Sequence, residues 1–484
     1  MSTQKKLMSN WRWWLCSLLF VATTVNYLDR QVLSLTYDEF IKPEFHWTDS
    51  DYGTITSLFS FFYAFACLFA GKFVDWMGTK KGYLIAIGVW SAGACLHALC
   101  GWATAMMVPG VDSVAALRAV EAGSNIALAI STTSVYLFLL CRGILALGEA
   151  GNFPAAIKAT AEYFPKKDRA FATSIFNAGS SVGALAAPLC IPPLAQHLGW
   201  EMAFIIIGSL GFLWMFFWVF MYDKPEQCKH VNAAELEYIQ QDDAAEAAEK
   251  AALAKEKSIS IWGALKYRQT WSFIAAKFFT DGVWWFFLFW APSYFTNQFD
   301  APPTSGQGQA LIFTLYAIVT ALSIFGGYLP KYFVENRQMH PYNGRMLAML
   351  LFAFVPLTAL LAQPLGMSTG NPWLPAIFIG LAGAGHQAWS ANLYSTVGDM
   401  FPKSTTATIT GIGQMAGGIG SMLIQKSAGV LFTYSETAGE AFSFLGFTGK
   451  PAGYFIMFCF CGVAYLIAWA LMKTLVPRYK AIEL

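Results

Sequence analysis

Apolar segments about 20 residues long recur along this chain of 484 residues. A segment of that length is enough to cross the hydrocarbon core of a bilayer as an α-helix. Twelve such segments are predicted, near residues 13–36, 52–75, 82–104, 132–153, 169–195, 200–222, 271–296, 309–333, 344–363, 374–399, 405–432 and 451–473. Only 12% of the residues are charged, against about 25% in a soluble domain, so the chain lacks the surface of a water-soluble globule. We therefore predict an all-α membrane protein with twelve transmembrane helices.

One passage occurs in both halves of the chain. The first copy, Gly148–Thr173, reads GEAGNFPAAIKATAEYFPKKDRAFAT, and the second, Gly385–Thr410, reads GHQAWSANLYSTVGDMFPKSTTATIT. Each copy runs from an apolar segment through a short charged hinge into the next apolar segment, and the Phe-Pro-Lys hinge that ends at Lys166 aligns with the one that ends at Lys403. Internal repeats of this size build many secondary transporters. The repeat predicts two pseudo-symmetric bundles of six helices.

Two polar stretches interrupt the apolar pattern. We expect residues 1–222 to form the first bundle, residues 223–270 a cytoplasmic linker and residues 271–484 the second bundle. Within the linker, Asn232 followed three residues later by Glu235 is typical of a helix start. Residues 107–131 are too polar for a span, so we predict an extracytoplasmic excursion that contains a short helix.

The distribution of positive charge predicts the orientation in the membrane. Of the 31 Lys and Arg residues, 24 fall at the two ends of the chain and in the even-numbered connections between spans. By the positive-inside rule, both termini are expected in the cytoplasm and the protein in the inner membrane of a bacterium. The first apolar run ends in Asn26–Arg30 rather than at a small-residue cleavage site, so we expect it to be retained as a span.

Several function classes find no support in the sequence. The nine cysteines form no CxxC pair and no metal-ligand spacing, so neither a metal nor a cofactor is expected. No nucleophile–base constellation and no phosphate-binding loop is present, which argues against an enzyme. We expect a monomer in the lipid bilayer, with a small organic anion and protons as its partners and no nucleic acid.

The predicted loop after the second span carries a recognisable motif, GKFVDWMGTKKG (Gly71–Gly82). Gly71 and Gly78 permit close helix approach and a tight turn, Asp75 can accept hydrogen bonds at a neighbouring helix start, and Lys80 can anchor the inner face. The motif resembles the G-x-L-x-D-x-x-G-R-[RK] signature of the major facilitator superfamily, in which this loop acts in gating. The second half has only a degraded version, ending at Arg345, with no acid in the place of Asp75.

A finer resemblance involves four further passages. They are NYLDRQ (Asn26–Gln31), RGILALGEAGNFPAAIKATAEYFPKKDRA (Arg142–Ala170), KFFTDGVWWFFLFWAPSYF (Lys277–Phe295) and HQAWSANLYSTVGDMFPK (His386–Lys403). These are similar to the anion:cation symporter family within that superfamily, and most similar to its bacterial hexuronate (glucuronate and galacturonate) transporters. The resemblance implies that Asp29 and Glu149 are the proton-titrating pair, that Arg30 grips the substrate carboxylate and that Tyr63 contacts substrate.

The residue types support those roles independently. Arg30 offers a planar, permanently charged fork that suits a carboxylate. Asp29 precedes it, but adjacent side chains on a helix point about 100° apart, so the two need not neutralise each other. The alternative is an Asp29–Arg30 network that only ties helices together. Glu149 lies among small and apolar neighbours that favour its protonated form, and Arg142, two turns earlier, can hold it ionised in one state.

The remaining candidates each have a structural alternative. Lys277 and Asp281 are spaced i,i+4. They either form an internal salt bridge, or Lys277 is free to bind the anion. His386, the repeat mate of Glu149, titrates, binds a hydroxyl or packs in the core. Amide side chains either hydrogen-bond to substrate hydroxyls or form hydrogen bonds between helices. Aromatic side chains either bind the face of a sugar ring or pack against neighbouring helices. The predicted substrate site comprises Tyr27, Arg30, Tyr63, Lys277, Trp285, His386, Asn392 and Gln414.

The sequence as a whole therefore predicts a proton-coupled symporter that imports a sugar-acid anion by alternating access. A hexuronate is the expected substrate, and galactonate, glucarate or tartrate are the alternatives. A drug/proton exporter of the same superfamily is a further alternative, but Arg30 and Lys277 favour anions over greasy cations.

Overall fold

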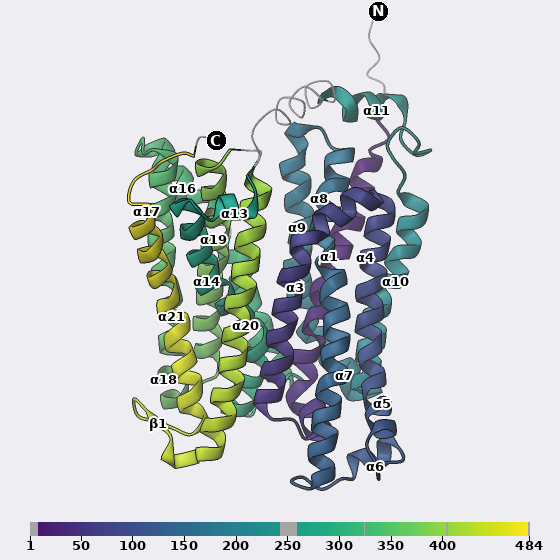
Figure 1. The fold of residues 1–484 in the computed structure, drawn as a ribbon, viewed down its shortest axis with the longest axis vertical. Helices are drawn as coiled ribbons and strands as arrows, with labels where there is room; N and C mark the ends of the chain where they lie inside the picture. The colour runs from purple at the N-terminus through teal and green to yellow at the C-terminus, as the bar shows by residue number, and fades with distance from the viewer. Residues whose placement is uncertain (1–7, 243–258, 324, 403–404, 483–484) are drawn as a thin grey trace, which may run out of the picture.

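The computed structural model describes residues 8–242, 259–323, 325–402 and 405–482. Figure 1 shows two helical bundles side by side, with α1 to α10 in one and α13 to α21 in the other. We call them the N-half and the C-half. The start of α1 and the end of α21 lie on the same side of the molecule, here called the terminal face, and α6 and β1 lie on the opposite face (Figure 1). Lys403 of the repeat lies outside the described residues.

The N-half consists almost entirely of helices. Its elements are α1 (Trp11–Thr36), η1 (Tyr37–Ile41), α2 (Lys42–Phe45), α3 (Asp49–Met77), α4 (Thr79–Leu96), η2 (His97–Leu99), α5 (Cys100–Met107), α6 (Val114–Arg118), α7 (Asn125–Glu149), α8 (Asn152–Tyr163), α9 (Lys166–Leu198) and α10 (Trp200–Met221). The linker adds α11 (Ala233–Ile239) and η3 (Gln240–Asp242).

The C-half repeats this plan and adds one small hairpin. Its elements are α13 (Ile261–Ala264), α14 (Arg268–Phe299), α15 (Gly306–Ser323), α16 (Phe325–Asn336), α17 (Pro341–Phe354), η4 (Val355–Thr358), α18 (Ala359–Thr369), α19 (Trp373–Met400), α20 (Thr406–Ala438), η6 (Gly439–Ala441), β1 (Ser443–Phe444), β2 (Phe447–Thr448) and α21 (Lys450–Leu475). The two strands pair antiparallel on the opposite face.

Each predicted apolar segment coincides with one long helix or with a run of consecutive helices. Nine of these, within the described residues, are long and apolar enough to cross a membrane by those criteria alone. The three others are α1, α19 and α20, which have 26, 28 and 33 residues. They have the length of a span but carry polar side chains and glycines, as expected for helices that line a passage rather than face lipid.

The structure corrects the boundaries around the fourth span. The predicted segment 132–153 belongs to a helix that begins earlier, at Asn125, because Ser124 caps it by accepting from the Ala127 N–H at 3.1 Å. The chain then breaks at Ala150–Gly151 and continues as α8 to Tyr163. The predicted short helix of the 107–131 excursion is present as α6.

The two copies of the repeat adopt matching local structures at the hinge. Phe164 follows α8 with φ −124° and ψ 132°, and Phe401 follows α19 with φ −116° and ψ 146°. In both copies the extended residue precedes a proline, which disfavours helical backbone before it and so ends the helix. The sequence repeat is therefore also a structural repeat.

The first part of the linker packs on the N-half instead of hanging free as a tether. Asn232 caps α11 as predicted, with its side chain accepting from the Glu235 N–H at 2.9 Å. The fully buried Glu235 carboxylate accepts from the N–H groups of Trp11 and Arg12 at the start of α1, where the helix dipole favours an anion. It also pairs with the Arg12 guanidinium at 2.9 Å.

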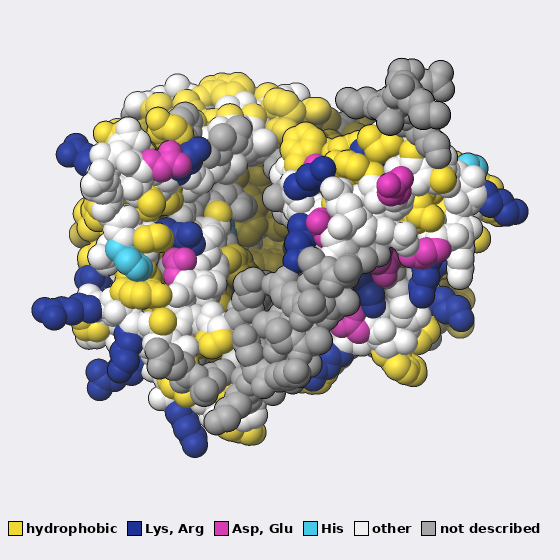
Figure 2. All heavy atoms as spheres, turned by 90° about the horizontal axis from the view of Figure 1, so that it is seen from above, with side chains coloured by type: hydrophobic (Ala, Val, Ile, Leu, Met, Phe, Trp, Pro, Cys, Tyr) yellow, Lys and Arg dark blue, Asp and Glu magenta, His cyan; other side chains and the backbone are white. Residues whose placement is uncertain are grey.

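The halves meet closely along α3 and α20. An added Cβ at Gly53 would lie 2.9 Å from Gly429, and one at Gly418 would lie 2.0 Å from Ala64, so this seam depends on small residues. Seen from the terminal face, the molecule is hollowed between the halves (Figure 2). The structure is thus closed toward the opposite face and open toward the terminal face.

Candidate functional site

Arg30 and Glu149 form a buried ion pair in the N-half. Arg30 Nε and Nη2 both donate to Glu149 Oε2, at 3.0 and 2.7 Å. The side chains are 4% and 0% exposed, and the second carboxylate oxygen, Oε1, is buried without a hydrogen-bond partner in the part of the chain that the structure describes. Glu149 is placed by the close packing of α7 on α4, because a Cβ at Gly148 would lie 2.3 Å from the Trp90 backbone nitrogen. The two charges are therefore held together away from water.

Three predicted aromatic residues surround the Arg30 guanidinium. Its carbon lies 5.0 Å from the ring centre of Tyr27, 4.8 Å from that of Tyr63 and 4.9 Å from that of Trp285. Such contacts stabilise a cation through the negative faces of the rings. Trp285 belongs to α14 of the C-half, whereas the others belong to α1 and α3, so Arg30 lies where the halves meet.

A second charge pair lies in the C-half. Lys277 Nζ is 2.6 Å from Asp281 Oδ2 and donates to the Tyr394 hydroxyl at 2.8 Å. Gln414 Nε2 donates to the same hydroxyl at 2.5 Å. Tyr394, which the sequence analysis missed, therefore joins two predicted residues from α14 and α20. A sequence signal for this group lies on one face of α14, where three residues follow one another at intervals of four: Lys277, Asp281 and Trp285. This pattern could have indicated a site on this side of the bundle.

The two groups of residues border one small cavity of about 20 Å³. Its lining includes Ser60 and Tyr63 of the N-half and Asp281, Trp285, Gln414 and Ser421 of the C-half. This volume holds little more than one water molecule, so a sugar acid can bind here only when the lining side chains give way. A cavity of about 650 Å³ on the C-half suits an anion less, because its lining, Thr296–Asp300, Gln307, Met367, Gly370 and Pro372, contains one acid and no lysine or arginine.

Asp29 and Arg142 are also buried in the N-half, and each is 2% exposed. Both Asp29 oxygens and Arg142 Nη1 lack a hydrogen-bond partner among the described residues. Arg142 was predicted to hold Glu149 ionised in one state; in this conformation the ion-pair partner of Glu149 is Arg30. Residues seven apart on one helix are separated by about 10 Å along its axis, whereas Arg30 approaches from another helix.

Two predicted substrate residues are engaged in the packing of the C-half. His386 Nδ1 lies 2.7 Å from the Tyr465 hydroxyl, and its ring stacks on Trp284 with centroids 5.7 Å apart. Asn392 Nδ2 donates to the carbonyls of Gly326 and Ala388, at 2.7 and 2.8 Å. Both side chains therefore join helices, and neither is among the residues that line the small cavity.

We expect His386→Ala to lower the melting temperature and to weaken affinity for the transported anion, because the Tyr465 and Trp284 contacts disappear. The pH midpoint of transport should stay where it is in the unaltered protein, since proton handling is assigned to the N-half. Uptake measured between pH 5 and 8, where an ordinary histidine titrates, tests this. A shifted midpoint at unchanged affinity would contradict it and make His386 a titrating group.

The terminal-face loop motif is held within the N-half. Gly78, with φ +77°, forms the tight turn between α3 and α4. Asp75 pairs with Lys158 of α8 at 2.8 Å, and Lys80 pairs with Asp223 at 2.8 Å. Gly71 does not support close helix approach here, because an added Cβ would meet nothing within 4 Å. In the C-half, where the loop lacks an acid, Arg345 pairs instead with Asp399 at 3.3 Å.

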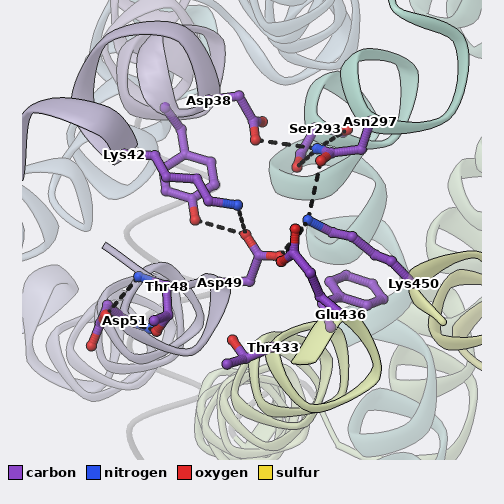
Figure 3. A network of polar contacts seen from close by, with 12 residues as sticks. Asp38, Lys42, Thr48, Asp49, Asp51, Ser293, Asn297, Thr433, Glu436 and Lys450 are labelled. Carbon is purple, nitrogen blue, oxygen red and sulfur yellow. Dashed lines mark hydrogen bonds and ion pairs between the residues drawn. The ribbon is translucent and has the colours of Figure 1, made fainter. Parts of the chain in front are cut away.

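A polar network joins the halves at the opposite face (Figure 3). Asp49 of α3 is its centre: it accepts from the Tyr37 hydroxyl at 2.8 Å and lies 2.9 Å from Lys42 Nζ. Across the interface, Lys450 Nζ is 2.7 Å from the other Asp49 oxygen. Lys450 also donates to Asn297, whose amide donates to Asp38 (Figure 3).

The Lys42 ammonium of this network stays charged through the physiological pH range. Burial disfavours the ammonium of Lys42, but the carboxylates of Asp49 and Asp38 outweigh it and raise the pKa of Lys42 to about 12. Burial also raises the pKa of Asp38, and nearby Lys42 opposes that rise. Lys42 therefore remains a charged partner of Asp49 within the N-half.

Lys450→Met should shift the protein toward the conformation that is open at the opposite face, because it removes the ion pair between halves. We expect a shift of about tenfold in the populations, less than complete loss of a buried charge partner causes, because Asp49 keeps Lys42. Lys42→Met is the matched control: it removes a pair with the same Asp49 carboxylate but within the N-half. Distances between spin labels at Glu121 and Leu445, both exposed at this face, report the populations. Equal shifts for the two variants would contradict a closing role for Lys450.

Comparison with known proteins agrees with this architecture. The family model described as Major Facilitator Superfamily matches residues 19–424. The hexuronate transporter of Escherichia coli strain K12 is 29% identical over 423 residues, covering 87% of this chain and 87% of that protein. The galacturonate transporter of Dickeya chrysanthemi is 29% identical over 345 residues, covering 71% and 88%. The inward open xylose transporter XylE from E. coli superposes with a TM-score of 0.65 at 12% identity, covering 95% of this chain and 96% of that one.

Proposed function

Because the chain belongs to the Major Facilitator Superfamily, we propose that it is a proton-coupled symporter that imports a sugar-acid anion. The family and the similar curated proteins are membrane transporters, so the chain is a multi-pass transporter and not an enzyme. The named substrates of those relatives are hexuronate and galacturonate, which are organic anions. For this chain, glucuronate and galacturonate are the proposed substrates.

The observation that carries the proposal is the buried Arg30–Glu149 pair inside its aromatic surround. A guanidinium that already donates from Nε and Nη2 to one carboxylate oxygen can also bind the carboxylate of a substrate. Tyr27, Tyr63 and Trp285 supply flat apolar faces on which a sugar ring can lie beside the charge. The pair also lies where both halves meet, which is where alternating-access transporters hold their substrates.

Exchange of carboxylates on Arg30 explains how a proton can be coupled to an anion. While Glu149 is ionised it occupies Arg30, as in this structure. Protonation of Glu149 removes its charge and leaves Arg30 without an ionic partner in a poorly hydrated site, which is costly. A substrate carboxylate then takes the place of Glu149. Release of both proton and anion on the other side restores the resting pair.

Coupling to one proton also accounts for the energetics of import. A monoanion that enters a cell with a negative interior is opposed by about 2.3 kcal/mol per 100 mV. One accompanying proton makes the step electroneutral, and each unit of pH difference then contributes about 1.4 kcal/mol. Import thus follows the pH gradient and is independent of membrane voltage at this stoichiometry.

The C-half contributes the groups that select the rest of the sugar. Gln414 borders the cavity that Trp285 and Tyr63 line, and it shares the Tyr394 hydroxyl with Lys277. His386 and Asn392 act behind this layer, through the packing of α19. Asp29 is the proposed second proton-accepting group, because its carboxylate is buried and accepts no hydrogen bond from the described residues.

The terminal face is proposed to be cytoplasmic, on the basis of the positive-inside distribution of Lys and Arg. The hollow of Figure 2 then opens to the cytoplasm, and the Asp49–Lys450 network closes the outer side. The protein is proposed to work as a monomer in the bacterial inner membrane, since the passage between the halves lies within one chain.

Uptake into proteoliposomes tests the proposal. Vesicles with an alkaline interior should accumulate labelled glucuronate, and a protonophore that collapses the pH gradient should abolish the accumulation. Imposed voltage without a pH gradient should have little effect. Accumulation that ignores the pH gradient, or that follows an imposed sodium gradient instead, would contradict proton coupling.

A further inference from the structure

We propose that Asp281 makes the site selective for sugar acids with one carboxylate and excludes those with a carboxylate at both ends. The inference rests on the proposed function and concerns the substrate class of the same site. It goes beyond carboxylate binding by Arg30, because it assigns a discriminating role to a residue that carries the same sign of charge as the substrate.

The position of Asp281 is the first reason. Its carboxylate lies 2.6 Å from Lys277 Nζ and borders the cavity that Tyr63, Trp285 and Gln414 line. Asp281 Oδ2 packs directly against Gly417 of α20, since a Cβ added at Gly417 would lie only 2.2 Å from it. The carboxylate therefore has no room to move toward α20. The absence of a side chain at Gly417 therefore leaves just enough space for the carboxylate, which stays fixed between Lys277 and the cavity.

The charge balance of the site is the second reason. The N-half contributes Arg30, paired with Glu149, and the C-half contributes Lys277, paired with Asp281. Each pair is neutral when both members are ionised. When Glu149 takes up a proton, one positive charge is left over, and a single substrate carboxylate neutralises it. A monoanion and one proton thus leave the site neutral.

A diacid of the same chain length fits this balance poorly. With one carboxylate on Arg30, its far end points into the C-half part of the site, where Lys277 is the available cation. Lys277 is already neutralised by Asp281, so the second carboxylate gains little from the lysine and is repelled by the acid. Hexuronates and aldonates, whose far end is an uncharged hydroxyl or carbonyl, avoid this repulsion and can bind the Tyr394 and Gln414 side.

Asp281→Asn is the variant that isolates the charge. It keeps the shape of the side chain and an oxygen for Lys277, but leaves Lys277 with a full positive charge for a second carboxylate. Inhibition of labelled glucuronate uptake by unlabelled glucuronate and by glucarate measures the preference. We expect the ratio of the two inhibition constants to shift toward glucarate by about tenfold or more.

Two further variants separate charge from space. The double variant Lys277→Met/Asp281→Asn lacks the lysine that Asp281→Asn leaves unneutralised. The shift of the inhibition ratio toward glucarate should therefore disappear. Asp399→Asn is the matched control, because Asp399 is a C-half acid paired with Arg345 outside the cavity. The ratio of the two inhibition constants in this variant should equal that of the unaltered protein. If Asp281→Asn is poorly folded in thermal unfolding, Asp281→Ser removes the same charge with a smaller side chain.

An unchanged ratio in Asp281→Asn, or the same shift in the double variant, would overturn the assignment of Asp281. These results differ from a failure of the proposed function, in which the unaltered protein takes up no sugar acid at all. A tenfold shift that depends on Lys277 supports both the inference and the position of the substrate between the two charge pairs.

Discussion

Uptake of the sugar acid should fall by about a hundredfold when Arg30 is replaced by Lys, a loss typical of a broken buried charge contact. An ammonium carries the same charge but cannot donate two parallel hydrogen bonds to one carboxylate. It would also lose part of the planar stacking against Tyr27, Tyr63 and Trp285. Initial rates of labelled glucuronate uptake into proteoliposomes, over a range of concentrations, measure the effect.

Arg12→Lys is the matched control for this substitution. Arg12 is also buried and also paired with a glutamate, Glu235, at 2.9 Å, but it lies at the start of α1, away from the cavity. Transport by Arg12→Lys should stay close to that of the unaltered protein. Normal substrate affinity in Arg30→Lys would remove Arg30 from the site and make its pair with Glu149 a structural tie.

Glu149→Gln should separate exchange from accumulation. Glutamine resembles the protonated carboxyl group, so Arg30 is permanently available to a substrate carboxylate. Exchange of labelled for unlabelled substrate needs no deprotonated carrier and should continue, whereas accumulation driven by a pH gradient should be lost almost completely. Both can be measured in one preparation of vesicles, and the exchange assay then shows that the variant is folded.

Full accumulation by Glu149→Gln would show that Glu149 is not the coupling group. Coupling would then move to Asp29, the buried acid of α1, and Asp29→Asn should show the separation of exchange from accumulation in its place. Loss of exchange together with accumulation would mean that the Arg30–Glu149 pair is needed for the halves to move.

The helices were predictable because apolar segments of sufficient length have few alternatives in a membrane protein. That reasoning succeeded even for α20, a helix of 33 residues in which glycines and amides reduce the hydropathy. It succeeded there because α20 follows a hinge that repeats the hinge between α8 and α9. It failed at the ends of α7, because the Ser124 cap and the break at Gly151 are local features that hydropathy does not contain.

Side-chain partners were less predictable than side-chain identities. Arg30 and Glu149 could be singled out in the sequence because a charge in a span is costly. Their binding to each other could not be predicted, because the distance between them depends on how α1 and α7 are placed in the bundle. Asn392 was predicted at the substrate, and the sequence did not indicate that its amide joins α19 to the Gly326 carbonyl. Tyr394 was not expected at all, because a tyrosine in an apolar helix gives no sign of which hydroxyl contacts it will make.

The carboxylate of Glu235 at the start of α1 has a consequence for biosynthesis. Because chains leave the ribosome from the N-terminus, α1 enters the membrane long before residue 235 exists, and its first turn stays uncapped until then. Glu235, which binds the N–H groups of Trp11 and Arg12, is made after all six spans of the N-half and before any span of the C-half. The linker thus completes the N-half as a finished folding unit, on which the second bundle can then assemble.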